Sequence, residues 1–268
     1  MTRRAIGFLD SGLGGLSVLK EALHLLPEED MVFIGDDNRA PYGGLSVDEI
    51  RHHVLELVAF LLAKDIKVLV LACNTASALL LDELQAQLSI PVVGVIVPGV
   101  TKALSVTKTH KIVVLATSAT VASGVYEDLL HQSSPQTEVT SIACPSFVPL
   151  VESGQIDAPE VEQEVSDVLA GIDWDKDVVI LGCTHYPFLA PAISKALPQS
   201  VQLVDPGLET ANLLPIILGE TSSSQGQSSR QVRLYTTGDK GHFEQLASSW
   251  LGASYPVEEV VVDAPSGD

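Results

Sequence analysis

Short apolar runs alternate with longer amphipathic segments along most of this 268-residue chain. Several runs are continuous Val, Ile and Leu, which is the pattern of strands that are covered on both faces. Strands of this kind separated by helices are typical of βαβ units, so we expect an α/β fold with parallel sheets. The predicted strands are Ala5–Leu9, Met31–Ile34, Val68–Leu71, Val92–Val97, Ile112–Leu115, Val139–Ala143, Val178–Leu181, Val201–Val204, Val232–Tyr235 and Val260–Val262. The predicted helices are Leu16–Leu26, Val47–Ala63, Ala76–Leu88, Val121–Leu130, Pro159–Leu169, Phe188–Leu197, Leu208–Leu218 and His242–Leu251.

Two segments of the chain resemble each other. Val68–Thr75 and Val178–His185 each contain a buried-type strand, then a small residue, a cysteine and polar residues before a helix. The offset is 110 positions, from Cys73 to Cys183. A weaker similarity, with an offset of 107, relates Leu9-Asp10-Ser11 to Ala116-Thr117-Ser118. We therefore expect two related α/β halves whose matching strand ends face each other.

The charge of the chain excludes several classes of partner. A formal net charge of −19 argues against binding to nucleic acid or to an anionic membrane surface, which need clustered Lys and Arg. No apolar run approaches the roughly 20 residues that span a bilayer. The N-terminal apolar stretch is too short for a signal-peptide core, so a cytosolic protein is expected. An anionic ligand would have to be held by backbone dipoles and hydroxyl groups.

Cys73 and Cys183, the cysteines of the two similar segments, are both predicted at the carboxyl end of a parallel strand, where ligands bind in α/β folds. A helix that begins after each cysteine would stabilise its thiolate and lower a pKa that is about 8.5 in free cysteine. His185 lies close enough in sequence to tune the thiol of Cys183 or to stabilise charge. Cys144 has no polar helix start after it, and we expect it to be a buried structural residue.

Two facing thiols admit several kinds of chemistry. A redox pair usually has its cysteines two residues apart. Cys73, Cys183 and His185 make a sparse ligand set for zinc, and a Cys–His hydrolase would leave the second cysteine unexplained. A two-base proton exchange uses both thiols, as acid and base on opposite faces of one carbon. No lysine falls at a comparable strand end, which weighs against a pyridoxal Schiff base.

Other polar segments surround the predicted strand ends. The glycines of Asp10–Gly15 allow a tight turn that exposes backbone N–H groups, a suitable anion site. Thr117–Thr120 is predicted to cap a helix or to bind a ligand. Asp36–Gly44 is predicted as a loop near the site. The Ser/Gly/Gln-rich stretch 220–229 is predicted as a surface loop without a catalytic role.

Several motifs of this chain, taken together, resemble the glutamate racemases. They occur in order between residue 6 and about residue 212, and the two cysteine motifs are the most specific. The matching segments are Asp10–Ser17, Pro41–Gly43, Ala72–Ala76, Cys144–Glu152 and Gly182–Pro187. The sequence departs from the family's usual pattern at Asp37, at Leu45 and at Ala116-Thr117.

The resemblance implies interconversion of L- and D-glutamate without metal or pyridoxal, supplying D-glutamate for peptidoglycan in a bacterial cytosol. It implies two similar parallel-sheet α/β domains related by pseudo-twofold symmetry, with the active site between them. The first domain would comprise residues 1–98 and 208–268 and carry Cys73. The second would comprise residues 99–207 and carry Cys183. A homodimer is expected.

The resemblance also assigns roles to single residues. Cys73 and Cys183 would be the acid/base pair, assisted by Asp10, Glu152 and His185. Substrate would be bound by Asp10, Ser11, Tyr42, Gly43, Asn74, Thr75, Thr117, Thr120, Thr184 and His185. Three other functions remain open at this point: a racemase of aspartate or another amino acid, a Cys–His hydrolase, and a two-lobed amino-acid-binding protein.

Overall fold

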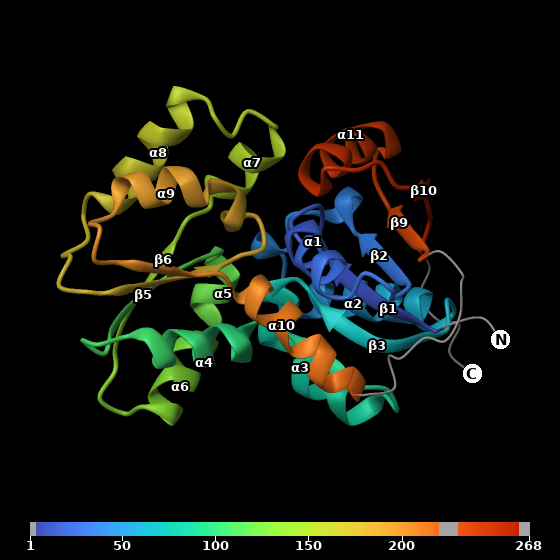
Figure 1. The fold of residues 1–268 in the computed structure, drawn as a ribbon, viewed down its shortest axis with the longest axis horizontal. Coiled ribbons are helices and arrows are strands. Elements are labelled where there is room, and N and C mark those ends of the chain that lie inside the picture. Colours follow the sequence, from blue (N-terminus) through green and yellow to red (C-terminus); the bar gives the residue numbers. More distant parts are fainter. Residues whose placement is uncertain (1–3, 220–229, 263–268) are drawn as a thin grey trace.

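The computed structural model describes residues 4–219 and 230–262 and contains two parallel sheets (Figure 1). The six-stranded sheet has the order β10-β9-β2-β1-β3-β4, and the four-stranded sheet has the order β6-β5-β7-β8. The strands of the first sheet are β1 (Ala5–Asp10), β2 (Met31–Gly35), β3 (Ile66–Leu71), β4 (Val92–Gly94), β9 (Val232–Thr236) and β10 (Val257–Glu259). Those of the second are β5 (Lys111–Ala116), β6 (Glu138–Ala143), β7 (Val178–Gly182) and β8 (Gln202–Val204).

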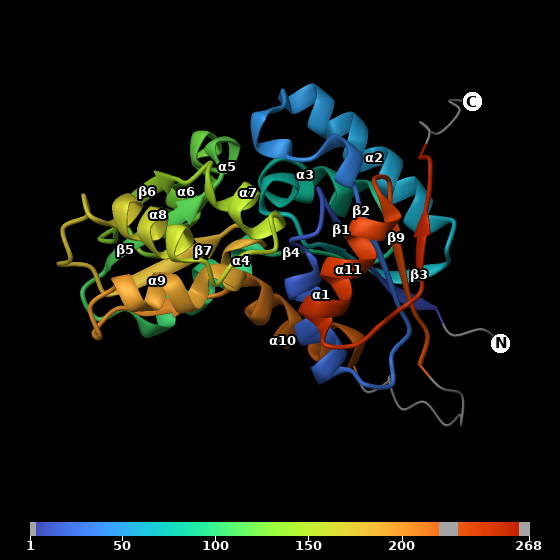
Figure 2. The same ribbon diagram turned by 90° about the horizontal axis from the view of Figure 1, so that it is seen from above.

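Helices cover both faces of each sheet (Figures 1 and 2). The six-stranded sheet lies between α2 (Val47–Leu62) and α3 (Asn74–Gln87) on one face, and α1 (Leu16–Leu25) and α11 (Lys240–Leu251) on the other. The four-stranded sheet lies between two further pairs of helices. These pairs are α4 (Ile96–Val106) with α6 (Val125–Ser133), and α8 (Pro159–Leu169) with α9 (Ala190–Ala196). Helix α10 (Pro206–Leu218) packs against α1 and α4 and so joins the two halves.

Shorter helices lie in the connections near the strand ends. They are the 3-10 turns η1 (Asp37–Arg39), η2 (Tyr42–Gly44) and η3 (Tyr186–Leu189), and the α-helices α5 (Ser118–Ser123) and α7 (Phe147–Glu152). Within residues 4–219 and 230–262, no helix is both long and apolar enough to cross a membrane.

The two sheets repeat one strand order. Strands β2-β1-β3-β4 of the first sheet correspond in order to β6-β5-β7-β8 of the second, and all pairings are parallel. Cys73 follows β3 and Cys183 follows the corresponding strand β7. The expected fold, with two similar parallel sheets, is therefore confirmed. The domain boundaries at 98/99 and 207/208 stay a prediction.

The continuous apolar strands arise from burial on both faces. In β1, Ile6 and Phe8 belong to one apolar cluster and Leu9 belongs to the other. Successive side chains of a strand point to opposite faces, so both faces need apolar residues when both are covered. The first cluster also includes Val114 of β5 and Ile180 of β7, so one apolar core runs through both halves.

The observed elements differ from the predicted ones at several boundaries. Strand β4 ends at Gly94 and α4 begins at Ile96, although Val92–Val97 reads as one strand. Val95, Ile96 and Val97 are β-branched residues, which are typical of strands, so the sequence does not indicate that a helix begins here. The predicted helix Val121–Leu130 is divided at Gly124, whose φ of 68° is left-handed.

The strand predicted at Val260–Val262 is wrong. Strand β10 is Val257–Glu259, and it pairs with β9, which ends at Thr236. The N–H of Val260 donates to Thr236 O at 2.8 Å, after which β9 offers no further partner. Pairing, and not the β-branched Val-Val-Val sequence, therefore sets the strand. The loop predicted at 220–229 lies outside the described residues.

We predict that Leu69→Ala lowers the free energy of unfolding by about 3 kcal/mol, because a fully buried leucine leaves a cavity. Leu62, of which 40% is exposed, is the matched control, and Leu62→Ala should cost less than about 1 kcal/mol. Urea titration followed by circular dichroism measures both. Equal losses in the two variants would contradict this view of the core.

Candidate active site

A pocket with about 360 Å³ of empty volume is lined by residues from the carboxyl ends of both sheets. Most of the predicted site residues line it: Ser11, Tyr42, Gly43, Cys73, Asn74, Thr75, Thr117, Glu152, Cys183, Thr184 and His185. Two predicted residues, Asp10 and Thr120, are buried outside the lining and contact residues that belong to it. Ala40, Pro41 and Val148 also line the pocket, although no role in the site was assigned to them from the sequence.

Cys73 follows β3 and occupies the N-cap position of α3, where its side chain makes no capping hydrogen bond. Its thiol forms a hydrogen bond with Ser11 Oγ at 3.5 Å, and the N–H of Ala76 also faces the sulfur. Burial and the nearby carboxylate of Asp10 outweigh both contacts and raise the pKa of Cys73 to about 12. The expectation that this pKa is lowered at the helix terminus is therefore wrong, because burial and the charge of Asp10 outweigh the hydrogen bonds with Ser11 and the N–H of Ala76.

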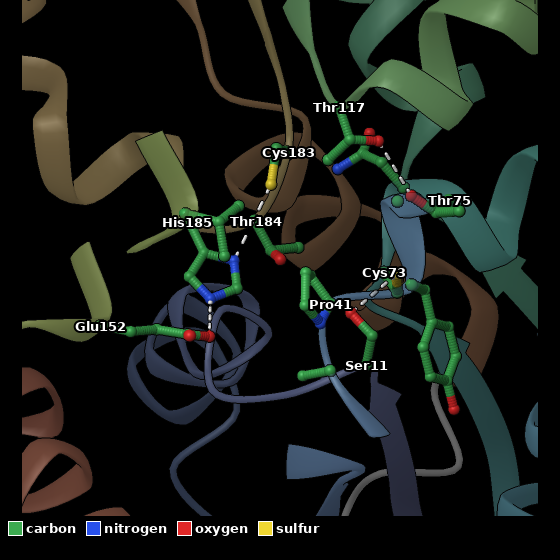
Figure 3. Close-up of a pocket in the computed structure, with 14 residues that line it drawn as sticks. Ser11, Pro41, Cys73, Thr75, Thr117, Glu152, Cys183, Thr184 and His185 are labelled. Carbon is green, nitrogen blue, oxygen red and sulfur yellow. Dashed lines mark hydrogen bonds and ion pairs between the residues drawn. The ribbon is translucent and has the colours of Figure 1, made fainter. Parts of the chain in front are cut away.

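Cys183 has a different set of neighbours (Figure 3). It is followed by a turn and the 3-10 helix η3, and the α-helix predicted to begin at Phe188 begins at Ala190 as α9. Its Sγ lies 3.8 Å from His185 Nδ1, and His185 Nε2 lies 2.9 Å from Glu152 Oε1. The three side chains form a line from α7 to the pocket, which we call the Cys183–His185–Glu152 relay.

The charge of His185 is set by this relay. Burial disfavours the imidazolium, but the hydrogen bonds with Cys183 and Glu152 outweigh it and raise the pKa of His185 to about 10. Below that pH both ring nitrogens carry protons, so Nδ1 donates toward the sulfur and Nε2 donates to the carboxylate. His185 is thus a cation inside a pocket that otherwise holds thiols, hydroxyls and a carboxylate.

Asp10, at the end of β1, links the first half of the protein to Thr184 of the second half. Its Oδ1 accepts from Thr184 Oγ1 at 3.3 Å, and its Oδ2 accepts from the N–H of Gly12 at 3.1 Å. Burial raises the pKa of this fully buried carboxyl group. A Cβ placed on Gly14 would lie 2.3 Å from His185 Nδ1, so this position requires glycine. The glycine turn therefore packs against the Cys183 side, and this packing brings Asp10 to Thr184.

A group of threonines closes another wall of the pocket (Figure 3). Thr75 Oγ1 lies 3.1 Å from Thr117 Oγ1 and 3.2 Å from Thr120 Oγ1. Thr117 caps α5 by accepting from the N–H of Thr120 at 3.3 Å, so it serves as a cap and as a lining residue. Asn74 Oδ1 accepts from Tyr126 OH at 2.7 Å, which orients the amide.

The loop that carries Pro41, Tyr42 and Gly43 is held by a buried polar network that the sequence did not reveal. Tyr42 OH donates to Asp36, and Arg39 Nε lies 2.8 and 2.9 Å from the two oxygens of Asp36. Arg39 also pairs with Glu56. Arg39 and Glu56 are 17 positions apart in the sequence, and the packing of α2 on the loop brings them together.

The pocket lining contains no lysine or arginine. Among residues 4–219 and 230–262, no group of three or more His, Cys, Asp or Glu side chains is placed to hold a metal ion. Backbone N–H groups, hydroxyls and His185 are therefore the groups that would meet an anionic ligand.

This architecture defines a class: two parallel α/β halves with a cysteine from each at one shared pocket. The model of the Asp/Glu/Hydantoin racemase family matches residues 16–214. The chain is 42% identical to the glutamate racemase of Streptococcus suis, covering 97% of this chain and 99% of that protein. The chain belongs to the Asp/Glu/Hydantoin racemase family.

Solved structures agree with this assignment. The chain is similar to a glutamate racemase isoform from Bacillus anthracis, with a TM-score of 0.91, 42% identity, and coverage of 97% of this chain and 98% of that one. It is also similar to a glutamate racemase from Francisella tularensis solved in complex with D-glutamate. That match has a TM-score of 0.89, 33% identity, and the same two coverages.

We predict that Glu152→Gln lowers the pKa of His185 from about 10 toward its ordinary value of 6.5, because the carboxylate that stabilises the imidazolium is lost. NMR titration of ¹³C-labelled histidine measures this change, with the His185 signal assigned from a His185→Gln variant. The NMR signal of His131, which lies on α6 outside the pocket lining, is an internal control that the substitution should leave in place. A His185 titration that is the same in both proteins would refute the assigned pairing.

Proposed function

We propose that this protein interconverts L- and D-glutamate by two-base proton exchange, with Cys73 and Cys183 on opposite faces of the substrate Cα. The observation that carries this proposal is that two equally buried thiols, each 5% exposed, reach one pocket from corresponding strand ends. The names of the close relatives support glutamate as the substrate.

The substrate carboxylates would be held by neutral donors. Ser11, Asn74 and Thr75 present hydrogen-bond donors on the Cys73 side of the pocket, and Thr184 presents one on the Cys183 side. Tyr42 and Gly43 would contribute backbone N–H groups, because the Tyr42 hydroxyl already donates to Asp36. The Cα–H bond is a very weak acid, so these donors must stabilise the negative charge that develops on the α-carboxylate. A buried pocket strengthens that stabilisation because little water screens it.

The two thiols would start the reaction in different protonation states. An imidazolium at His185 favours a thiolate at Cys183. Cys73, whose pKa is about 12, would remain a thiol that can donate a proton. In one direction, Cys183 removes the Cα proton and Cys73 delivers its own proton to the opposite face. In the other direction the roles are exchanged, and each turnover moves one negative charge from one sulfur to the other.

The assisting groups would act through the thiols. Glu152 holds His185 in its charged form. Asp10 lies behind Cys73 and Thr184, where its charge disfavours a thiolate at Cys73 in the free enzyme. We further propose that the enzyme acts in the cytosol as a homodimer and needs no metal or pyridoxal cofactor. The D-glutamate that it forms would serve peptidoglycan synthesis.

We predict that Cys73→Ala and Cys183→Ala each lower kcat for racemisation by about 10³-fold or more, because each removes one of the two proton-transfer groups. Incubation of L- and D-glutamate separately in heavy water, followed by NMR and optical rotation, measures exchange at Cα and loss of rotation. The wild-type enzyme should show both from either enantiomer.

Cys144→Ala is the matched control, since Cys144 is fully buried and lies outside the pocket lining. This variant should keep near-normal turnover. Normal turnover in both Cys73→Ala and Cys183→Ala would overturn the two-thiol proposal.

A further inference from the structure

Asp37 is a partly buried carboxylate that the reaction outlined above does not use. It begins the 3-10 turn η1 after β2. A Cβ placed on Gly238 would lie 2.8 Å from Asp37 Cβ, so no side chain fits at position 238. The N–H of Asn38 donates to Thr237 Oγ1 at 3.2 Å. The turn that precedes α11 therefore fixes the position of Asp37.

The backbone of Gly12 lies beside both Asp37 and the relay. A Cβ placed on Gly12 would lie 3.5 Å from Asp37 Oδ1 and also 3.5 Å from Glu152 Oε1. These two oxygens are therefore separated by no more than twice that distance. Glu152 Oε1 is the atom that pairs with His185 Nε2. Position 12 thus lies between the carboxylate of Asp37 and the outer end of the relay.

The groups around Asp37 come from four elements. Glu152 lies on α7, His242 on α11, His185 after β7, and Asp10 at the end of β1. Burial and then repulsion by Glu152 raise the pKa of Asp37 to about 6, against the opposing effect of the two histidines. Asp37 therefore gains its charge near neutral pH, where the imidazolium of His185 is already formed.

We propose that Asp37 is a positioning residue that acts on His185 through Glu152. Its ionised carboxylate adds a second negative charge beside the relay, and repulsion between the two carboxylates favours the contact of Glu152 with His185. Asp37 does not line the pocket, so it does not touch the substrate. The inferred effect of Asp37 on the reaction rate rests on the proposed function. Its inferred effect on the pKa of His185 does not depend on which reaction the enzyme catalyses.

We predict that kcat of the wild-type enzyme rises roughly threefold to tenfold as the pH increases through about 6, where Asp37 ionises. A change of this size is the effect expected of one partly screened charge a few ångströms from the relay. Asp37→Asn should lack this rise, and its activity should also fall at a lower alkaline pH than that of the wild type. KM should change little. The measurement is kcat and KM for glutamate from pH 5 to pH 10.5.

Two further variants make this test specific. Asp37→Thr also removes the charge and should behave like Asp37→Asn. Asp82→Asn removes an exposed carboxylate of α3 and should keep the wild-type profile. A rise near pH 6 that persists in both Asp37 variants would overturn the proposal.

NMR titration of His185 separates this inference from the proposed function. Asp37→Asn should lower the pKa of His185 and remove the inflection that the ionisation of Asp37 produces in its signal. An unchanged His185 titration overturns the role of Asp37, whatever the enzyme acts on. Absence of glutamate racemisation in the wild-type protein would overturn the proposed function and leave this titration interpretable.

Discussion

The chemistry of the site depends on the hydrogen-bonded line from Glu152 through His185 to Cys183. A buried imidazole would ordinarily be neutral, because burial disfavours its charged form. Here a carboxylate on one ring nitrogen and a sulfur on the other keep His185 protonated up to a pH of about 10. This buried cation faces the sulfur of Cys183 and not that of Cys73, so we expect the two thiols to differ in reactivity although corresponding strands present them and both are 5% exposed.

The fold supplies the remaining constraint, which is the placement of groups from distant parts of the chain around one pocket. Parallel strands in the order repeated by the two sheets bring Cys73 and Cys183 to facing strand ends. Glycine at position 14 allows the first half to pack directly on His185. A Cβ there would lie 2.4 Å from Thr184 Oγ1, the atom that donates to Asp10 and so joins the two halves. Close packing and proton chemistry are therefore linked.

The sequence predicted those features that arise from local pattern. The buried strands, the two cysteines at corresponding strand ends and the cap at Thr117 each follow from a few neighbouring residues. Features that depend on tertiary packing were missed or wrong. The pKa of Cys73 is raised and not lowered, because burial by distant segments exceeds the effect of its own helix. The anchoring of Tyr42 by Asp36, and the approach of Asp37 to Glu152, likewise join segments that no short pattern connects.

The difference in reactivity between Cys73 and Cys183 is tested most directly by alkylation with iodoacetamide at neutral pH, mapped by mass spectrometry. The two cysteines are equally exposed, so access alone should not separate them. Only the thiolate form of a cysteine reacts readily. The account predicts that Cys183 is modified well before Cys73, and that His185→Asn slows the modification of Cys183 but not that of Cys73. Equal rates at the two cysteines, or faster modification of Cys73, would contradict it.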